Sequence, residues 1–162
     1  MGMPTKGHQA VVGDYMVTKV MSLEASSSLE EAAKLLVEKK IRGAPVVDAD
    51  NKLVGVLSQF DFLFKCAGYS KAKTSSSTAA RSERFAAKSA TWDKIEAQTV
   101  SQAMTIDPIS VGPDTSMQDA AALLLNKRLG RLMVVDDDGQ LVGLLSCTDM
   151  MDLVLSGDLD MH

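Results

Sequence analysis

Hydrophobic and polar positions follow one another along this chain in a pattern that occurs twice. Residues 12–63 and 100–151 align without a gap at an offset of 88 residues, and about 19 of the 52 aligned positions are identical. A tandem repeat of this size indicates one structural unit used twice. A copy of about 52 residues is near the lower limit for an independent hydrophobic core. We therefore expect the two copies to pack together as one module.

Apolar residues at helical spacing predict a helix near the start of each copy. Ser28 and Glu31 fit a capping box, in which the two side chains satisfy free backbone N–H groups, and Ser116 with Asp119 opens the second helix in the same way. Basic residues suit the last turn of a helix, and a glycine can follow it. We expect the helices to be closed by Lys39, Lys40 and Gly43 in the first copy and by Lys127, Arg128 and Gly130 in the second.

Two short apolar runs divided by a polar turn follow each helix and predict a β-hairpin. Their near-continuous apolar character indicates strands covered on both faces. An extended segment before each first helix, at residues 20–23 and 106–111, adds a strand, and a second helix follows each hairpin. The predicted unit is β-α-β-β-α, so the chain is an α/β (α+β) protein of two repeats with pseudo-two-fold symmetry. The hairpin runs cover residues 44–47 and 53–57 in the first copy and residues 132–135 and 141–145 in the second.

The segment between the copies, residues 67–99, differs from both. Its first half is rich in Ser, Thr, Lys and Ala without an apolar period, which predicts a solvated loop. Its second half could form a helix in which Trp92 packs on the surface of the module. We therefore divide the chain into a first repeat at 12–66, a partly flexible insert at 67–99 and a second repeat at 100–156.

Composition and charge disfavour several classes of function. The net charge of −4 argues against a nucleic acid or an anionic membrane as partner, because both call for a basic face, and no apolar run is long enough to span a bilayer. Cys66 and Cys147 form neither a disulfide framework nor a metal-binding pattern, which favours an intracellular location, either cytoplasmic or, after removal of a transit peptide, in a plastid. Without a Ser-His-Asp set, a metal cluster or a Walker loop, we expect neither an enzyme nor a catalytic cofactor.

Both hairpins end in the pattern Gly-x-x-Ser-x-x-Asp. Each serine stands where a strand passes into a helix, and the free N–H groups of a helix start favour a phosphate. The aspartate one turn later is acceptor-only when ionised, which suits the two hydroxyl donors of a ribose. The alternative is a plain helix cap, with serine at the N-cap and aspartate in the first turn, and the two interpretations are compatible. The motif residues are Gly55, Ser58 and Asp61 in the first copy and Gly143, Ser146 and Asp149 in the second.

A β-α-β-β-α unit that occurs twice and closes each time on this motif resembles the cystathionine-β-synthase (CBS) domain, and the pair resembles a Bateman module. The resemblance covers residue 12 to about residue 155 and leaves no enzyme domain over, as in a stand-alone CBS pair. The long insert, which contains Thr91-Trp92-Asp93-Lys94, is similar to that of plant-type single CBS-pair proteins, which are associated with control of thioredoxins.

The resemblance implies two pockets for an adenosine-containing ligand. Arg42 and Arg131, which precede the first hairpin strands, would reach phosphates, although they are offset by one position in the alignment. The alternative for each arginine is a solvent-exposed charge at a helix end. The first pocket would combine Arg42, Val56, Ser58 and Asp61 with Ile109, Leu129 and Arg131. The second pocket would combine Arg131, Leu144, Ser146, Thr148 and Asp149 with Met21, Ile41 and Gly43.

The sequence therefore predicts a regulatory module that binds AMP, ADP, ATP or S-adenosylmethionine and modulates a partner protein, either a thioredoxin or an enzyme. Because Cys66 and Cys147 are not spaced as a redox pair, redox regulation through a thioredoxin would act by contact. The alternative function is a ligand-independent dimerisation and interaction scaffold. We also expect a homodimer formed by apolar residues of the second helices, namely Phe62, Phe64, Met150, Met151 and Leu153.

Overall fold

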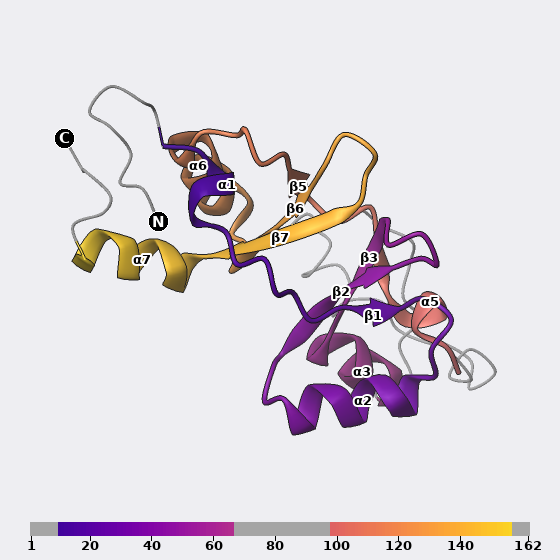
Figure 1. Cartoon of the computed structure of the whole chain (residues 1–162). Helices are drawn as coiled ribbons and strands as arrows, with labels where there is room; N and C mark the ends of the chain where they lie inside the picture. The colour runs from indigo at the N-terminus through magenta and orange to yellow at the C-terminus, as the bar shows by residue number, and fades with distance from the viewer. Residues whose placement is uncertain (1–9, 67–97, 157–162) are drawn as a thin grey trace. The chain divides into compact units, whose positions relative to one another are not determined.

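The computed structural model describes residues 10–66 and 98–156, which belong to two compact units (Figure 1). We name each unit after its motif serine. The Ser58 unit lies within Met21–Pro108, and the Ser146 unit combines the segment that ends at Val20 with the segment that begins at Ile109. Each unit therefore contains a short piece that belongs, by the sequence repeat, to the other copy.

The described part of the Ser58 unit is a four-stranded sheet with three helices. The strands lie in the spatial order β1 (Leu23–Glu24), β2 (Gly43–Val47), β3 (Leu53–Ser58) and β4 (Thr105–Ile106). β1 is parallel to β2, whereas the β2–β3 and β3–β4 pairs are antiparallel. The helices are α2 (Leu29–Glu38), α3 (Gln59–Cys66) and α5 (Val100–Ala103). Apolar residues of α2, α5 and the first three strands form the core, in which Leu57 and Val100 are fully buried.

The described part of the Ser146 unit repeats this plan with one strand fewer. Its sheet has the order β5 (Ser110–Val111), β6 (Arg131–Val135) and β7 (Leu141–Ser146), and β6 is parallel to β5 and antiparallel to β7. At the position equivalent to β4, Val17 forms a single antiparallel bridge to Leu144. The helices are α1 (Val12–Tyr15), α6 (Met117–Lys127) and α7 (Cys147–Ser156), and α7 continues directly from the end of β7 (Figure 1).

The mixed α/β class and both hairpins are confirmed, but the single strand predicted at residues 106–111 is wrong. Its two ends form separate strands, β4 in the Ser58 unit and β5 in the Ser146 unit. Asp107 adopts a left-handed backbone conformation, with φ of 52°, and Pro108 has no N–H to donate. These two residues interrupt the strand at the passage between the units. The short helices α1 and α5 were not expected from the hydrophobic pattern.

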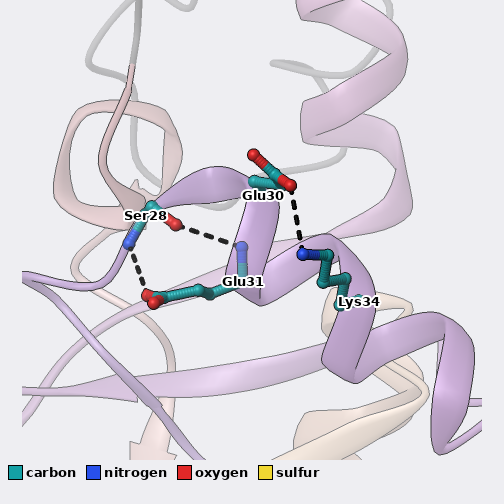
Figure 2. A network of polar contacts seen from close by, with 4 residues as sticks. All are labelled: Ser28, Glu30, Glu31 and Lys34. Carbon is teal, nitrogen blue, oxygen red and sulfur yellow. Dashed lines mark hydrogen bonds and ion pairs between the residues drawn. The ribbon is translucent and has the colours of Figure 1, made fainter.

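The serine caps predicted for the first helices are confirmed. In α2 the N–H of Glu31 donates to the Ser28 hydroxyl oxygen at 3.1 Å, and the Ser28 N–H donates to the Glu31 carboxylate at 3.2 Å (Figure 2). Figure 2 also shows the exposed pair of Glu30 with Lys34, at 3.1 Å and one helical turn apart. In α6 the corresponding bond runs from the Asp119 N–H to the Ser116 hydroxyl, at 3.0 Å.

The prediction that glycines close these helices is wrong. α2 ends at Glu38 and α6 at Lys127, and the left-handed position after each helix is taken by a basic residue, Lys40 with φ of 54° or Arg128 with φ of 52°. The next N–H then donates back to the carbonyl oxygen five residues earlier, as in a Schellman motif. Gly43 instead opens β2, where a Cβ would lie 2.9 Å from the carbonyl oxygen of Leu57 on the neighbouring strand.

Two further predictions concern the insert and the second helices. The insert, predicted at 67–99, falls outside the described residues except for its last two, and so do Trp92 and the side chain of Phe64. The division into repeats at 12–66 and 100–156 stays a prediction. Of the residues expected on a dimer surface, Phe62, Met150 and Leu153 are partly buried against the cores of their own units, and Met151 is exposed. The homodimer stays a prediction.

Candidate functional site

The first Ser-x-x-Asp segment lies where β3 ends and α3 begins. The backbone N–H of Ser58 donates to Oδ2 of Asp61 at 2.8 Å, so the aspartate folds back over the start of its own helix. Only 6% of Asp61 is exposed. The next N–H, that of Gln59, donates to the carbonyl oxygen of Arg42 at 2.8 Å. This bond fixes the arginine backbone beside the motif, while the Arg42 side chain is exposed.

The second segment, between β7 and α7, has a fuller set of bonds. The Ser146 N–H donates to Oδ2 of Asp149 at 3.0 Å, and the Asp149 N–H donates to the Ser146 hydroxyl oxygen at 3.0 Å. The Cys147 N–H donates to the carbonyl oxygen of Gly130 at 3.0 Å, and its thiol donates to that of Leu129 at 3.4 Å. The strand-to-helix junction and the end of α6 are thereby tied together within the Ser146 unit.

The arginines flank the two motifs in different ways, as their offset in the alignment predicts. Arg131 is the first residue of β6 and is paired directly with Ser146, so its side chain starts about 5 Å from that of the serine. At the corresponding place in the Ser58 unit the partner of Ser58 is Gly43, and Arg42 stands one residue before the strand. An arginine therefore borders each junction, but from a different backbone position.

These bonds confirm that the motif caps a helix. An ionised carboxylate has two oxygens and about four acceptor positions, of which the Ser146 N–H occupies one at Asp149. A serine hydroxyl that accepts from an N–H keeps its own proton to donate. The serine backbone N–H groups hold the carboxylates of Asp61 and Asp149 at the starts of their helices.

The remaining predicted site residues are distributed between the units. In the Ser58 unit, Val56 precedes Ser58 on β3, and Ile41 and Gly43 are partly buried. In the Ser146 unit, the partly buried residues are Ile109, Leu129 and Leu144, whereas Thr148 is exposed. Met21, at the start of the Ser58 unit, is 39% exposed. The two pockets that combine these residues across the repeats stay predictions, as do their ligand contacts.

The glycine of each motif has a structural role that sequence analysis did not assign. A Cβ on Gly55 would lie 2.5 Å from the Met104 sulfur, and a Cβ on Gly143 would overlap the Met16 sulfur. Met16 and Met104 occupy the same position in the two copies, directly after α1 and α5. This identity was the available signal, because an identical methionine in both copies suggests the same neighbour in both.

Other kinds of site find no support in the described residues. Within the described residues, 10–66 and 98–156, no group of three or more His, Cys, Asp or Glu side chains could hold a metal ion. Among the same residues, no helix combines the length and the apolar character needed to cross a membrane.

Two small α/β units, each with a capped Ser-x-x-Asp junction bordered by an arginine, define a tandem repeat protein with a duplicated motif. The family model for the CBS domain matches residues 12–68 and 100–156. The chain therefore belongs to the CBS domain family and carries two copies of the domain, which confirms the resemblance seen in its motifs.

Similar proteins include two from Arabidopsis thaliana, named CBS domain-containing proteins CBSX2 and CBSX1, chloroplastic. CBSX2 is 36% identical over 157 residues, with 88% of this chain and 63% of the relative covered. CBSX1 is 36% identical over 149 residues, with 83% and 60% covered. The chain thus spans about three fifths of the length of these relatives.

Solved structures give the same family assignment. The crystal structure of CBSX2 in complex with AMP matches with a TM-score of 0.72 and 32% identity, and covers 93% of this chain and 99% of that one. The CBS domain pair of protein MJ0100, solved with 5′-methylthioadenosine and S-adenosyl-L-methionine, matches with a TM-score of 0.66 over 93% and 99% of the two chains. At 21% identity, the second likeness concerns the fold alone.

Proposed function

We propose that this chain is a regulatory module that binds an adenosine-containing ligand through its Ser58–Asp61 and Ser146–Asp149 segments. The observation that carries the proposal is the duplicated junction, in which the serine backbone orients a carboxylate at the start of a helix. The crystal structure of a 32% identical relative in complex with AMP supports the same ligand class. The chain would act through a partner and would catalyse no reaction of its own.

We call the Ser58–Asp61 and Ser146–Asp149 segments, each with its neighbouring arginine, the two half-sites. Among the four ligands considered, a nucleotide fits these half-sites better than S-adenosylmethionine does. The carboxylates of Asp61 and Asp149 would accept from the ribose hydroxyls, which all four ligands share. Arg42 and Arg131 would contact phosphate oxygens, which S-adenosylmethionine lacks. Its sulfonium and amino groups are cationic and would be repelled by an arginine, and its single carboxylate is the only group that an arginine could pair with. We therefore place AMP, ADP and ATP before S-adenosylmethionine, with AMP first because of the CBSX2 complex.

Isothermal titration calorimetry tests this proposal on protein stripped of co-purified small molecules. We expect heat of binding with AMP, and we expect Asp61→Asn and Asp149→Asn each to raise the Kd of one site about tenfold or more, since a hydrogen bond to a charged group contributes about 1.5–3 kcal/mol. Asparagine is close in shape and can still accept from the serine N–H, so the helix cap is retained. Asp138→Asn, in the exposed β6–β7 turn, is the matched control and should leave the Kd unchanged. Absence of binding by the wild-type protein to all four ligands at millimolar concentration would exclude the proposal.

A dimerisation scaffold remains the second candidate function, because α3 and α7 expose apolar residues at equivalent positions. Leu63 is 59% exposed and its counterpart Met151 is 58% exposed. We expect sedimentation to show a dimer that Leu63→Glu or Met151→Glu weakens. Val37→Glu on α2, where the valine is 77% exposed, is the control and should leave the mass unchanged. A dimer that is indifferent to AMP would favour the scaffold over the regulatory module.

The partner and the location follow from family likeness and charge. We propose a protein partner, with a thioredoxin tested first and a metabolic enzyme second, and no nucleic acid, in keeping with the net charge of −4. The relatives CBSX1 and CBSX2 are named chloroplastic, which supports a plastid location over the cytoplasm. Pull-down with thioredoxin in the presence and absence of AMP tests the partner, and organelle fractionation tests the location.

A further inference from the structure

Each unit contains a methionine that fills the space left by the motif glycine. In the Ser146 unit, a Cβ on Gly143 would overlap the Met16 sulfur and lie 2.8 Å from Met16 Cγ. In the Ser58 unit, a Cβ on Gly55 would lie 2.5 Å from the Met104 sulfur and 3.0 Å from Met104 Cγ. Both methionines are partly buried and pack against the cores of their units. The same contact therefore occurs twice, at equivalent positions of the repeat.

The two contacts lie beside the strands that carry the motif serines. Directly after Met16, Val17 exchanges two hydrogen bonds of 2.9 Å with Leu144, the residue that follows Gly143. Directly after Met104, Thr105 pairs with Val56, the residue that follows Gly55. Leu144 and Val56 are predicted ligand contacts, and each lies two residues before the motif serine. The methionine thus holds the residues that follow it, starting at Val17 or Thr105, against the end of the strand that leads to the motif serine. We call these residues the crossing segment.

We infer that Met16 and Met104 are positioning residues of the two half-sites, and that oxidation of their thioethers lowers ligand affinity. This inference rests on the proposed function. A thioether without a branch at Cβ enters the narrow space above a glycine more readily than a β-branched side chain does, and it forms no polar contact there. With the thioether in place, the crossing segment stays paired and the end of the strand keeps its orientation toward the helix start.

The oxidation step needs a peroxide as oxidant. Hydrogen peroxide transfers one oxygen to the methionine sulfur: an S–O bond forms, the O–O bond breaks, the sulfur is oxidised and the peroxide is reduced to water. The product, a sulfoxide, is polar and larger. Because the sulfur already occupies the space of the missing Cβ, the added oxygen has no room on the glycine side. The side chain must move outward, and the crossing segment loses its contact.

The test uses AMP as probe and compares leucine variants of the two methionines beside the motif glycines with a leucine variant of an exposed methionine. Leucine keeps most of the apolar volume but cannot be oxidised, and such swaps are tolerated well in cores. After peroxide treatment of the wild-type protein, with sulfoxide formation at each methionine followed by mass spectrometry, we expect the Kd for AMP to rise about threefold to tenfold. Faster hydrogen exchange at the Val17 and Leu144 amides should accompany the rise. The Met16→Leu/Met104→Leu variant should resist both changes.

Met151→Leu is the matched control. Met151 is 58% exposed on α7, so we expect it to oxidise readily, and it does not occupy the space beside a motif glycine. The Met151→Leu variant should remain as sensitive to peroxide as the wild type. Complete oxidation of Met16 and Met104 with unchanged Kd and unchanged exchange would overturn the inference, and so would equal sensitivity of the double leucine variant. If the untreated protein does not bind AMP, the proposed function fails by itself, and the exchange of Val17 and Leu144 still decides whether the thioether holds the segment.

Discussion

The Ser58 and Ser146 units close the same motif with different hydrogen bonds. In the Ser146 unit the serine and aspartate satisfy each other reciprocally, through the Ser146 hydroxyl and the Asp149 carboxylate. In the Ser58 unit the serine N–H donates to the Asp61 carboxylate, and among the described residues no bond from the Asp61 N–H to the Ser58 hydroxyl is present. One copy of the motif is therefore a reciprocal helix cap, whereas the cap bond of the other runs in one direction. Duplication has preserved the motif residues but not their hydrogen bonds.

A second difference concerns the surroundings of the motif glycines. The three atoms nearest to a Cβ on Gly143 all belong to the Met16 side chain, whereas a Cβ on Gly55 would approach the Met104 side chain and also the backbone oxygen of Thr105, at 2.8 Å. The reason is that β4 pairs with β3 at two positions, whereas Val17 makes a single bridge to β7. The Ser58 unit therefore has the more rigid crossing segment.

The largest expected effect in this comparison comes from alanine at the two glycines. We expect Gly55→Ala and Gly143→Ala each to destabilise the protein by about 1–3 kcal/mol, the usual range for overpacking, and Gly55→Ala to be the worse of the two. Met16→Ala should largely relieve Gly143→Ala, because it removes the two nearest atoms, the sulfur and Cγ of Met16, and leaves Met16 Cβ at 3.2 Å. Met104→Ala should relieve Gly55→Ala only in part, since the backbone oxygen of Thr105 remains. Urea unfolding of the single and double variants measures these couplings.

Gly130→Ala is the control for this series, because a Cβ on Gly130 would meet no atom within 4 Å. Its unfolding midpoint should match that of the wild type. Equal relief in both units would contradict the difference that we draw between β4 and the Val17 bridge.

Alanine at the two serines should produce a smaller effect that differs between the units. Ser146→Ala removes the acceptor of the Asp149 N–H and should destabilise by about 1 kcal/mol, as the loss of an N-cap does. Ser58→Ala breaks no hydrogen bond within the described residues and should stay within about 0.5 kcal/mol of the wild type. Both should weaken AMP binding in calorimetry. Equal losses of stability would mean that the two junctions cap their helices alike.

Much of this architecture could be predicted from the sequence, because local patterns determine it. The hairpins follow from apolar runs with a polar turn, and the caps at Ser28 and Ser116 follow from side chains that reach only their own helix. The exchange of α1 and α5 between the copies could not be predicted. It depends on which sheet edge each segment meets, and the four-residue helices carry too few positions for a periodic signal.

The features of the candidate site that depend on neighbouring residues could likewise be predicted, and those that depend on distant contacts could not. The capping role of Asp61 and Asp149 was predictable, because the partner lies three residues away in the sequence. The difference between the two motifs was not, because identical residues gave no indication that Ser58 and Ser146 use their hydroxyls differently. The role of the motif glycines also depends on methionines that lie 49 residues (104 − 55) and 127 residues (143 − 16) away in the sequence, which no local pattern describes.

The smallest expected effect concerns the helix ends, where the two units are most alike. Lys40 and Arg128 occupy the left-handed position after α2 and α6, which costs a side-chain-bearing residue about 1–2 kcal/mol. Glycine removes this strain but adds about 0.5–1 kcal/mol of conformational entropy to be lost on folding. We therefore expect Lys40→Gly and Arg128→Gly each to stabilise by about 0.5 kcal/mol, equally in the two units and without change in AMP binding. Thermal unfolding measures the gain. A gain in only one unit would contradict this expectation and would show that the two units differ at their helix ends as well as in their motifs.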